Sequence, residues 1–134
     1  MPARTDDGYG VIDLNEVLGK HKGAVAYAFA AFHAEQPQDV ELRLGSINAN
    51  KVWLNGELLT SNEIYHANMF IDQYVGRGRL KAGRNEILVK IAQNEQTEAW
   101  AEAWMFQLRV CDAIGTAVRS TPAGDQASVR QDTL

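Results

Sequence analysis

Aromatic residues in long polar connections are the side chains of this chain best placed to bind a ligand. Trp100 lies in the polar stretch 93–102, and Tyr65 and His66 lie in the connection 61–67. Aromatic rings stack on the apolar C–H faces of sugars, while polar neighbours hydrogen-bond the hydroxyls. The predicted ligand-binding residues are Trp100, Tyr65 and His66 for stacking, with Asn68 or Arg77 for hydrogen bonds. The alternative is that these rings cap the ends of the fold.

Three acidic residues close to Trp100 raise a catalytic alternative. Glu95, Glu98 and Glu102 have the spacing of one side of a helical turn, and glycoside hydrolysis needs two carboxylates about 5–10 Å apart. Nothing nearby predicts the apolar pocket that raises the pKa of a catalytic acid. A solvated acidic face explains the three residues better. Since the chain also has no nucleophile elbow, phosphate loop or dinucleotide fingerprint, we predict that it is not an enzyme.

Histidine and cysteine positions argue against a metal centre or a disulfide. His21, His33 and His66 are far apart in the sequence, whereas a metal-binding strand would carry two ligands close together. The single cysteine, Cys111, rules out an intrachain disulfide, has no adjacent cysteine and is expected to be inert as the outer member of an alternating strand. We therefore predict no metal ligand, no cofactor and no catalytic residue.

Length and charge limit the classes of partner. The chain has 134 residues, of which 46% are hydrophobic and 22% charged, with a net charge of −4. These values are typical of one soluble domain that buries roughly two-thirds of its unfolded surface. A nucleic-acid binder of this size would show a basic stripe, and none is present. No run is long enough to span a membrane, and the first residues show no signal-peptide pattern, so we predict neither nucleic acid nor membrane as partner.

Turn signals and alternation predict that most of the chain is β. Asn55-Gly56 lies between two apolar-rich segments and favours a two-residue hairpin, because both residues tolerate positive φ. Residues 24–34 contain six alanines, which favour helix, but Val25, Tyr27 and Phe29 alternate, and we predict a strand with small residues on one face. The other predicted strands are 40–44, 68–75, 87–91 and 104–111, with a turn at 80–85 around Gly83.

These elements predict an all-β fold made of an antiparallel two-sheet β-sandwich. Short strands separated by turn signals are typical of a sandwich or barrel, and the connections are too short for a parallel α/β fold. We predict a lead-in at 1–10, a sandwich domain at 11–118 and a C-terminal tail at 119–134, where periodicity is lacking. Trp104 continues the apolar face of its strand and is predicted to be core, while Trp53 lies either on the opposite sheet face or under a loop.

Three motifs occur in an order that resembles a known family. They are Ala26-Tyr27-Ala28, then Gly45-Ser46 followed by residues 51–57 (KVWLNGE), then residues 80–85 (LKAGRN) leading into Leu88-Val89-Lys90. This order is similar to that of the galactose-binding-domain-like β-sandwich, a jelly roll that accompanies many glycoside hydrolases. The resemblance covers roughly residues 11–111. It implies a jelly-roll accessory module of a larger secreted protein, extracellular or periplasmic.

The resemblance has one departure that bears on calcium. Related sandwich modules often carry paired aspartates before the strand that corresponds to 51–54, and these aspartates hold a calcium ion that binds sugar hydroxyls. Here the segment is Ile47-Asn48-Ala49-Asn50, and calcium prefers sites that include carboxylates. A calcium-dependent sugar site is therefore not expected at this position, although some relatives hold a structural ion elsewhere.

Two functions follow as expectations. The first is a non-catalytic module that binds carbohydrate through its end loops or one sheet face. The second is a structural or protein–protein interaction domain of the same fold, which docks onto a neighbouring domain or self-associates. The missing acidic residues at 47–48 favour the second function, whereas Trp100, Tyr65 and His66 favour the first.

Overall fold

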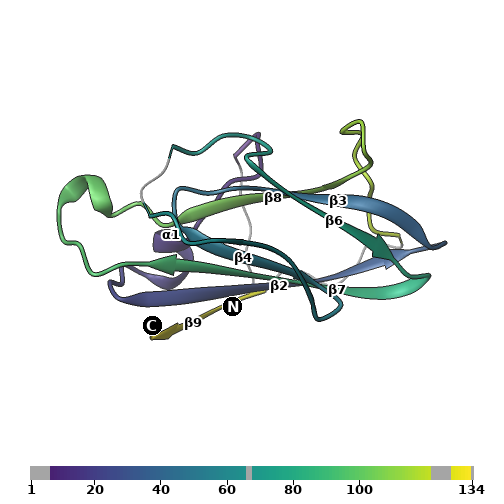
Figure 1. Ribbon diagram of the computed structural model, residues 1–134. Helices are drawn as coiled ribbons and strands as arrows, with labels where there is room; N and C mark the ends of the chain where they lie inside the picture. The colour runs from purple at the N-terminus through teal and green to yellow at the C-terminus, as the bar shows by residue number, and fades with distance from the viewer. Residues whose placement is uncertain (1–6, 66–67, 122–127, 134) are drawn as a thin grey trace.

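The computed structural model describes residues 7–65, 68–121 and 128–133. Two antiparallel sheets pack face to face, with β8, β3 and β6 in one layer and β4, β7 and β2 in the other (Figure 1). The elements are β1 (Ile12–Asp13), α1 (Leu14–Leu18), β2 (Ala24–Ala34), β3 (Gln38–Gly45), β4 (Ala49–Leu54), β5 (Glu57–Asn62), β6 (Tyr74–Leu80), β7 (Gly83–Gln93), the 3-10 helix η1 (Ala99–Ala101), β8 (Met105–Cys111) and β9 (Ser128–Thr133). The predicted all-β, two-sheet architecture is confirmed.

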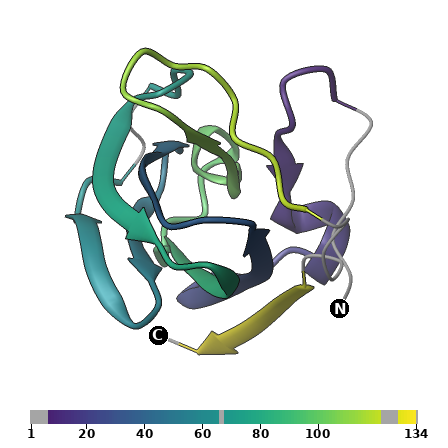
Figure 2. The same ribbon diagram turned by 90° about the vertical axis from the view of Figure 1, so that its right-hand side faces the viewer.

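The strand order of both sheets comes from pairing across long sequence distances. The four-stranded sheet has the order β1-β8-β3-β6, and the five-stranded sheet has the order β5-β4-β7-β2-β9. The first eight strands therefore pair as β1 with β8, β2 with β7, β3 with β6 and β4 with β5. Figure 2 shows β9, in yellow, at the edge of its layer. No helix in the described residues is both long and apolar enough to cross a membrane.

The Asn55-Gly56 turn is the hairpin that the sequence predicts, and a second asparagine ties it to the neighbouring turn. Asn55 has a φ of 51° and Gly56 a φ of 80°, as a two-residue turn between β4 and β5 requires. The side-chain amide of Asn55 donates to Oδ1 of Asn85 at 2.9 Å. Asn85 is fully buried and also donates to the carbonyls of Lys81 and Gly83. One side chain thus holds the β6–β7 turn and links it to the β4–β5 turn.

The alanine-rich segment 24–34 is a strand because its whole length pairs with β7. All eleven residues of β2 face a partner on β7, from Ala24 opposite Gln93 to Ala34 opposite Gly83. Ala24, Ala26 and Ala28 point into the core, so long-range pairing and burial override their helix propensity. The prediction of a strand with small residues on one face is confirmed.

Trp104 lies at the centre of the core, as predicted. Its side chain is fully buried, and its indole Nε1 donates to the carbonyl of Ile91 at 3.1 Å. The alternate residues Ile87, Val89 and Ile91 of β7 face the same core, which confirms the predicted alternation. Trp53 lies on the opposite side of its sheet from Val52, so it takes the outward position.

Two segment predictions are wrong. The predicted strand 68–75 is a connection up to residue 73, and β6 begins only at Tyr74. Asp72, with a φ of 57°, interrupts it because its carboxylate binds Arg43 and Arg109 from other strands. The predicted tail 119–134 includes β9, which pairs with β2 and buries Val129. With one apolar residue facing the core, β9 has too little alternation to be recognised in the sequence.

Candidate functional site

Side chains on the outer side of the five-stranded sheet form two parallel rows across the strands. Strand registers place Lys51 opposite Lys90, Lys90 opposite Tyr27 and Tyr27 opposite Arg130. We call these four residues the cationic row. The residues two positions further along the strands form the apolar row, which consists of Trp53, Leu88 and Phe29. All of them alternate with core residues and therefore point away from the core.

The cationic row brings like charges together. Lys51 and Lys90 are directly opposite residues on β4 and β7, a placement in which like charges repel. In the described part of the chain, neither ammonium group has an ion-pair or hydrogen-bond partner. At the far end, the Arg130 guanidinium lies 5.4 Å from the centroid of the Tyr27 ring. Arg130 also pairs with Asp132, with 3.1 Å between Nη2 and Oδ2.

A cleft opens onto the same lysines. Its volume is about 260 Å³, and its walls include Tyr65, Asn62, Glu63, Lys51 and Lys90. Tyr65 is 37% exposed, so the residue is partly accessible from solvent. Since both lysines belong to the cationic row, a continuous polar track runs from Tyr65 across the sheet to Tyr27 and Arg130.

The apolar row offers ring and alkyl faces beside that track. Trp53, Leu88 and Phe29 are each half-buried, and a displacement of two residues along a strand puts the rows about 7 Å apart. The ladder between β4 and β5 shifts register at Val52 and Trp53, a β-bulge that redirects the strand beside the indole. Tyr27, Phe29, Leu88 and Arg130 also line one open hollow beside β9. Aromatic and cationic groups therefore share one surface.

The predicted site residues do not gather in one place. Tyr65 lies in the cleft beside the five-stranded sheet, whereas Arg77 lies on the outer side of the four-stranded sheet. Asn68 is exposed in the connection before β6, where its carbonyl accepts from Gln73. Trp100 has its backbone in η1, but its side chain lies outside the described part, and so does all of His66.

The sequence did not identify the residues of either row as site residues. Its alternation did indicate on which side of their strands some of them lie. Alternation placed Val25, Tyr27 and Phe29 on one side of their strand and Lys90 on the outer side of another. It could not tell which strands are neighbours or in which register they pair. Only the pairing of β4, β7, β2 and β9 assembles these residues into rows.

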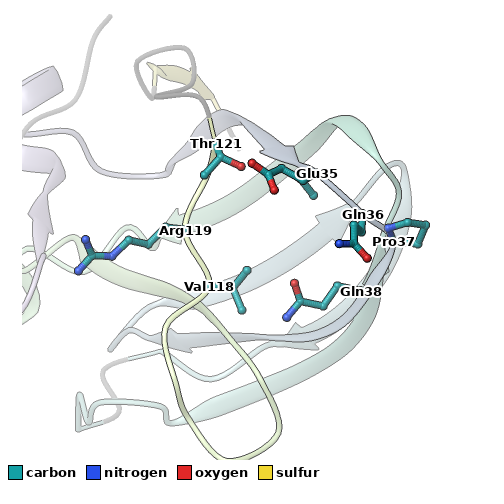
Figure 3. Close-up of a pocket in the computed structure, with 8 residues that line it drawn as sticks. Glu35, Gln36, Pro37, Gln38, Val118, Arg119 and Thr121 are labelled. Carbon is teal, nitrogen blue, oxygen red and sulfur yellow. The ribbon is translucent and has the colours of Figure 1, made fainter.

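A second hollow lies at the other end of the sandwich. It has a volume of about 430 Å³ between the β2–β3 connection and residues 118–121. Figure 3 shows Glu35, Gln36, Gln38 and Thr121 around it, with the Arg119 side chain directed away from them. None of the described residues that line it is aromatic, so it offers hydrogen bonds without a stacking surface.

The outer side of the four-stranded sheet carries an internally paired charge cluster. Asp72 receives hydrogen bonds from Arg109, at 2.8 and 2.7 Å, and from Arg43 at 3.1 Å. Hydrogen bonds from Arg109 and then Arg43 lower the pKa of the Asp72 carboxyl below its ordinary value. Arg43 also pairs with the buried Glu41, which Arg77 approaches to 3.4 Å. These charges satisfy one another.

Cys111 lies next to this cluster and is fully buried. Burial raises the pKa of its thiol, which keeps the group protonated and unreactive.

The other residues considered for catalysis or metal binding make contacts within the fold. Glu102 forms an exposed ion pair with Lys20 at 3.4 Å. Asn48 accepts from the Met105 amide, and Asn50 accepts from the Asn62 side chain, so their carbonyl oxygens are engaged within the fold. Among the described residues, no group of three or more histidine, cysteine, aspartate or glutamate side chains is arranged to hold a metal ion.

No protein-family model matches the chain, and no curated protein matches it either.

Proposed function

We propose that this protein is a non-catalytic module that binds carbohydrate on the outer side of its five-stranded sheet. The observation that carries the proposal is the apolar row of Trp53, Leu88 and Phe29 beside the polar track that leads to Tyr65. Sugars need both an apolar surface under the ring and hydrogen-bonding groups around its edge. This sheet face has both among its described residues.

The fold supports an accessory role of the galactose-binding-like, jelly-roll type. In a jelly roll a long antiparallel hairpin is wrapped into two sheets, so that strands pair from the outside inward. The pairs β1–β8, β2–β7, β3–β6 and β4–β5 follow that scheme, with β9 added at one edge. Together with the motif order in the sequence, this favours an accessory domain of a larger secreted protein, extracellular or periplasmic.

Affinity gel electrophoresis against soluble plant, algal and bacterial polysaccharides tests the proposal. We expect at least one polysaccharide to retard the protein. The variant Trp53→Ala should weaken that retardation about tenfold, because a stacking contact is lost. Phe70→Ala is the matched control, since Phe70 is 61% exposed in the connection before β6. No retardation by any polysaccharide, or equal loss in both variants, would contradict carbohydrate binding on this face.

A docking role remains the second candidate, and exposed apolar residues favour it. Ile71 and Ile114 are 52% and 88% exposed. They belong to two connections that meet at Arg43, which binds Asp72 and donates to the carbonyl of Ala113. This surface would pack against a neighbouring domain or a second copy. Light scattering tests self-association, and Ile114→Ser should abolish any dimer while leaving sugar binding unchanged.

A further inference from the structure

We infer that the carbohydrate bound by this face is anionic, a polysaccharide that carries carboxylate or sulfate groups. The inference rests on the proposed function and specifies the ligand. Its basis is the Lys51–Lys90 pair at the centre of the cationic row.

An unpaired pair of lysines is unfavourable without a ligand. Directly opposite residues of an antiparallel pair have Cβ atoms about 5 Å apart, so the two ammonium groups repel. Lys51 and Lys90 have no acidic partner in the described part of the chain. An anion between them would accept hydrogen bonds from both and remove the repulsion.

The same arrangement occurs on the other sheet, where the protein supplies the anion itself. Arg43 and Arg109 are directly opposite residues on β3 and β8. The carboxylate of Asp72 binds both guanidinium groups, with nitrogen–oxygen distances of 2.7–3.1 Å. This cation pair across two strands is therefore a carboxylate site. At Lys51 and Lys90 the carboxylate would come from the ligand.

The dimensions of the row favour a polymer over a small anion. Four strands at about 4.8 Å spacing give a row about 14 Å long, which exceeds one sugar ring. Arg130 lies at its far end and Tyr65 beside its near end, so several sugar units of a chain would contact charged and aromatic groups in turn. The apolar row would support ring faces on one side of that chain.

Two acidic residues lie near the track, and neither forms an ion pair with Lys51 or Lys90 in the described part of the chain. Asp132 is paired with Arg130 at 3.1 Å, and Glu63 lines the cleft beside Tyr65. The net charge of the whole chain is −4, so attraction of a polyanion must come from a local group of cations such as the cationic row. Such a confined site favours spaced anionic groups over the dense, continuous phosphate charge of a nucleic acid.

Matched polymer pairs that differ only in charge test the inference. Isothermal titration calorimetry would compare polygalacturonate with its fully methyl-esterified form, and dextran sulfate with dextran. The variants are Lys51→Gln with Lys90→Gln, and the control is Lys81→Gln, an exposed lysine in the β6–β7 turn. We expect the anionic member of one pair to bind more tightly. The double variant should lose about tenfold in affinity for it, while Lys81→Gln changes nothing.

The outcomes separate this inference from the proposed function. Equal affinity for the charged and neutral members would overturn the anionic ligand but leave carbohydrate binding in place. Unchanged affinity of the double variant would overturn the role of the lysines. Equally tight, lysine-dependent binding of a single-stranded oligonucleotide would show non-selective polyanion binding and also overturn it. Absence of binding to these polymers and to every polysaccharide of the gel panel would remove the proposed function itself.

Discussion

A pair of cations faces each other across neighbouring strands on the outer side of each sheet, and the two pairs differ in what lies between them. On the four-stranded sheet, Arg43 and Arg109 share the Asp72 carboxylate. On the five-stranded sheet, Lys51 and Lys90 are opposite each other with no acidic partner among the described residues. The first arrangement is complete within the chain, and the second is open to solvent and ligand.

The difference separates a structural surface from a candidate binding surface. Asp72 adopts a φ of 57°, a backbone conformation that most residues with a side chain avoid, and its ion pairs hold it there. The charges of this cluster therefore contribute to stability. On the five-stranded sheet the lysines contribute repulsion instead, and their removal should affect stability and binding in opposite directions.

The largest loss of stability is expected from a substitution in the core that both sheets share. Trp104 is fully buried between the sheets and bonds the Ile91 carbonyl. Trp104→Ala should lower the free energy of unfolding by about 3–5 kcal/mol, through a cavity and a lost hydrogen bond. Chemical denaturation with the fluorescence of the other tryptophans measures it. A loss under 1 kcal/mol, well below about 3 kcal/mol, would contradict the two-sheet core.

The Asp72 cluster should give the next largest effect. Asp72→Asn keeps a side chain that tolerates positive φ, so it changes the charge while preserving the backbone. It removes the carboxylate that Arg43 and Arg109 share, so Arg43 keeps Glu41 as its partner while Arg109 loses the ion pair that the described residues give it. We expect a loss of about 2 kcal/mol in unfolding free energy. Binding of a polysaccharide on the other sheet should not change. Equal stability of variant and parent would mean that the ion pairs are screened and contribute nothing.

Acid should reproduce this effect in the unmodified protein. Arg109 and Arg43 lower the pKa of Asp72 in the folded state, so the unfolded chain takes up the proton first as pH falls. The stability that Asp72 provides is complete above about pH 5 and is lost as pH falls through the folded-state pKa. In urea titrations, the gap between parent and Asp72→Asn should therefore close with acidification. A gap that stays constant from about pH 7 to about pH 3 would contradict the lowered pKa.

The sequence predicts where the strands and turns lie better than it predicts which strands pair. Alternation identifies the strand 24–34 despite its alanines, and Asn55-Gly56 identifies the hairpin, because both signals are local. Alternating apolar residues predict a strand at 68–75, but residues 68–73, which include Asp72, form a connection. Its Asp72 binds Arg43 and Arg109, which are far away in the sequence, and no local pattern shows that contact.

The candidate site illustrates the same limit. The alternation in β2 and β7 shows which of their side chains point outward, including Tyr27 and Lys90. That Lys90 lies between Lys51 and Tyr27 depends on the order and register of three strands. Pairing of this kind is a long-range property, and no local pattern in β4 or β7 specifies it. Tyr65 was predicted as a site residue, and its position beside these lysines was not.

The smallest expected effect concerns the Lys51–Lys90 pair itself. Lys90→Gln removes one charge from the Lys51–Lys90 pair and should raise the unfolding free energy by about 0.3 kcal/mol at low salt, because the repulsion is relieved. Salt should remove the gain, since it screens exposed charges. Lys81→Gln, in the β6–β7 turn, removes the same charge at an exposed position that lies outside the strand pairs of β6 and β7, and it should leave stability unchanged. If Lys90→Gln instead destabilises the protein at low salt, the lysine has a partner within the chain, and this face would resemble the Asp72 cluster.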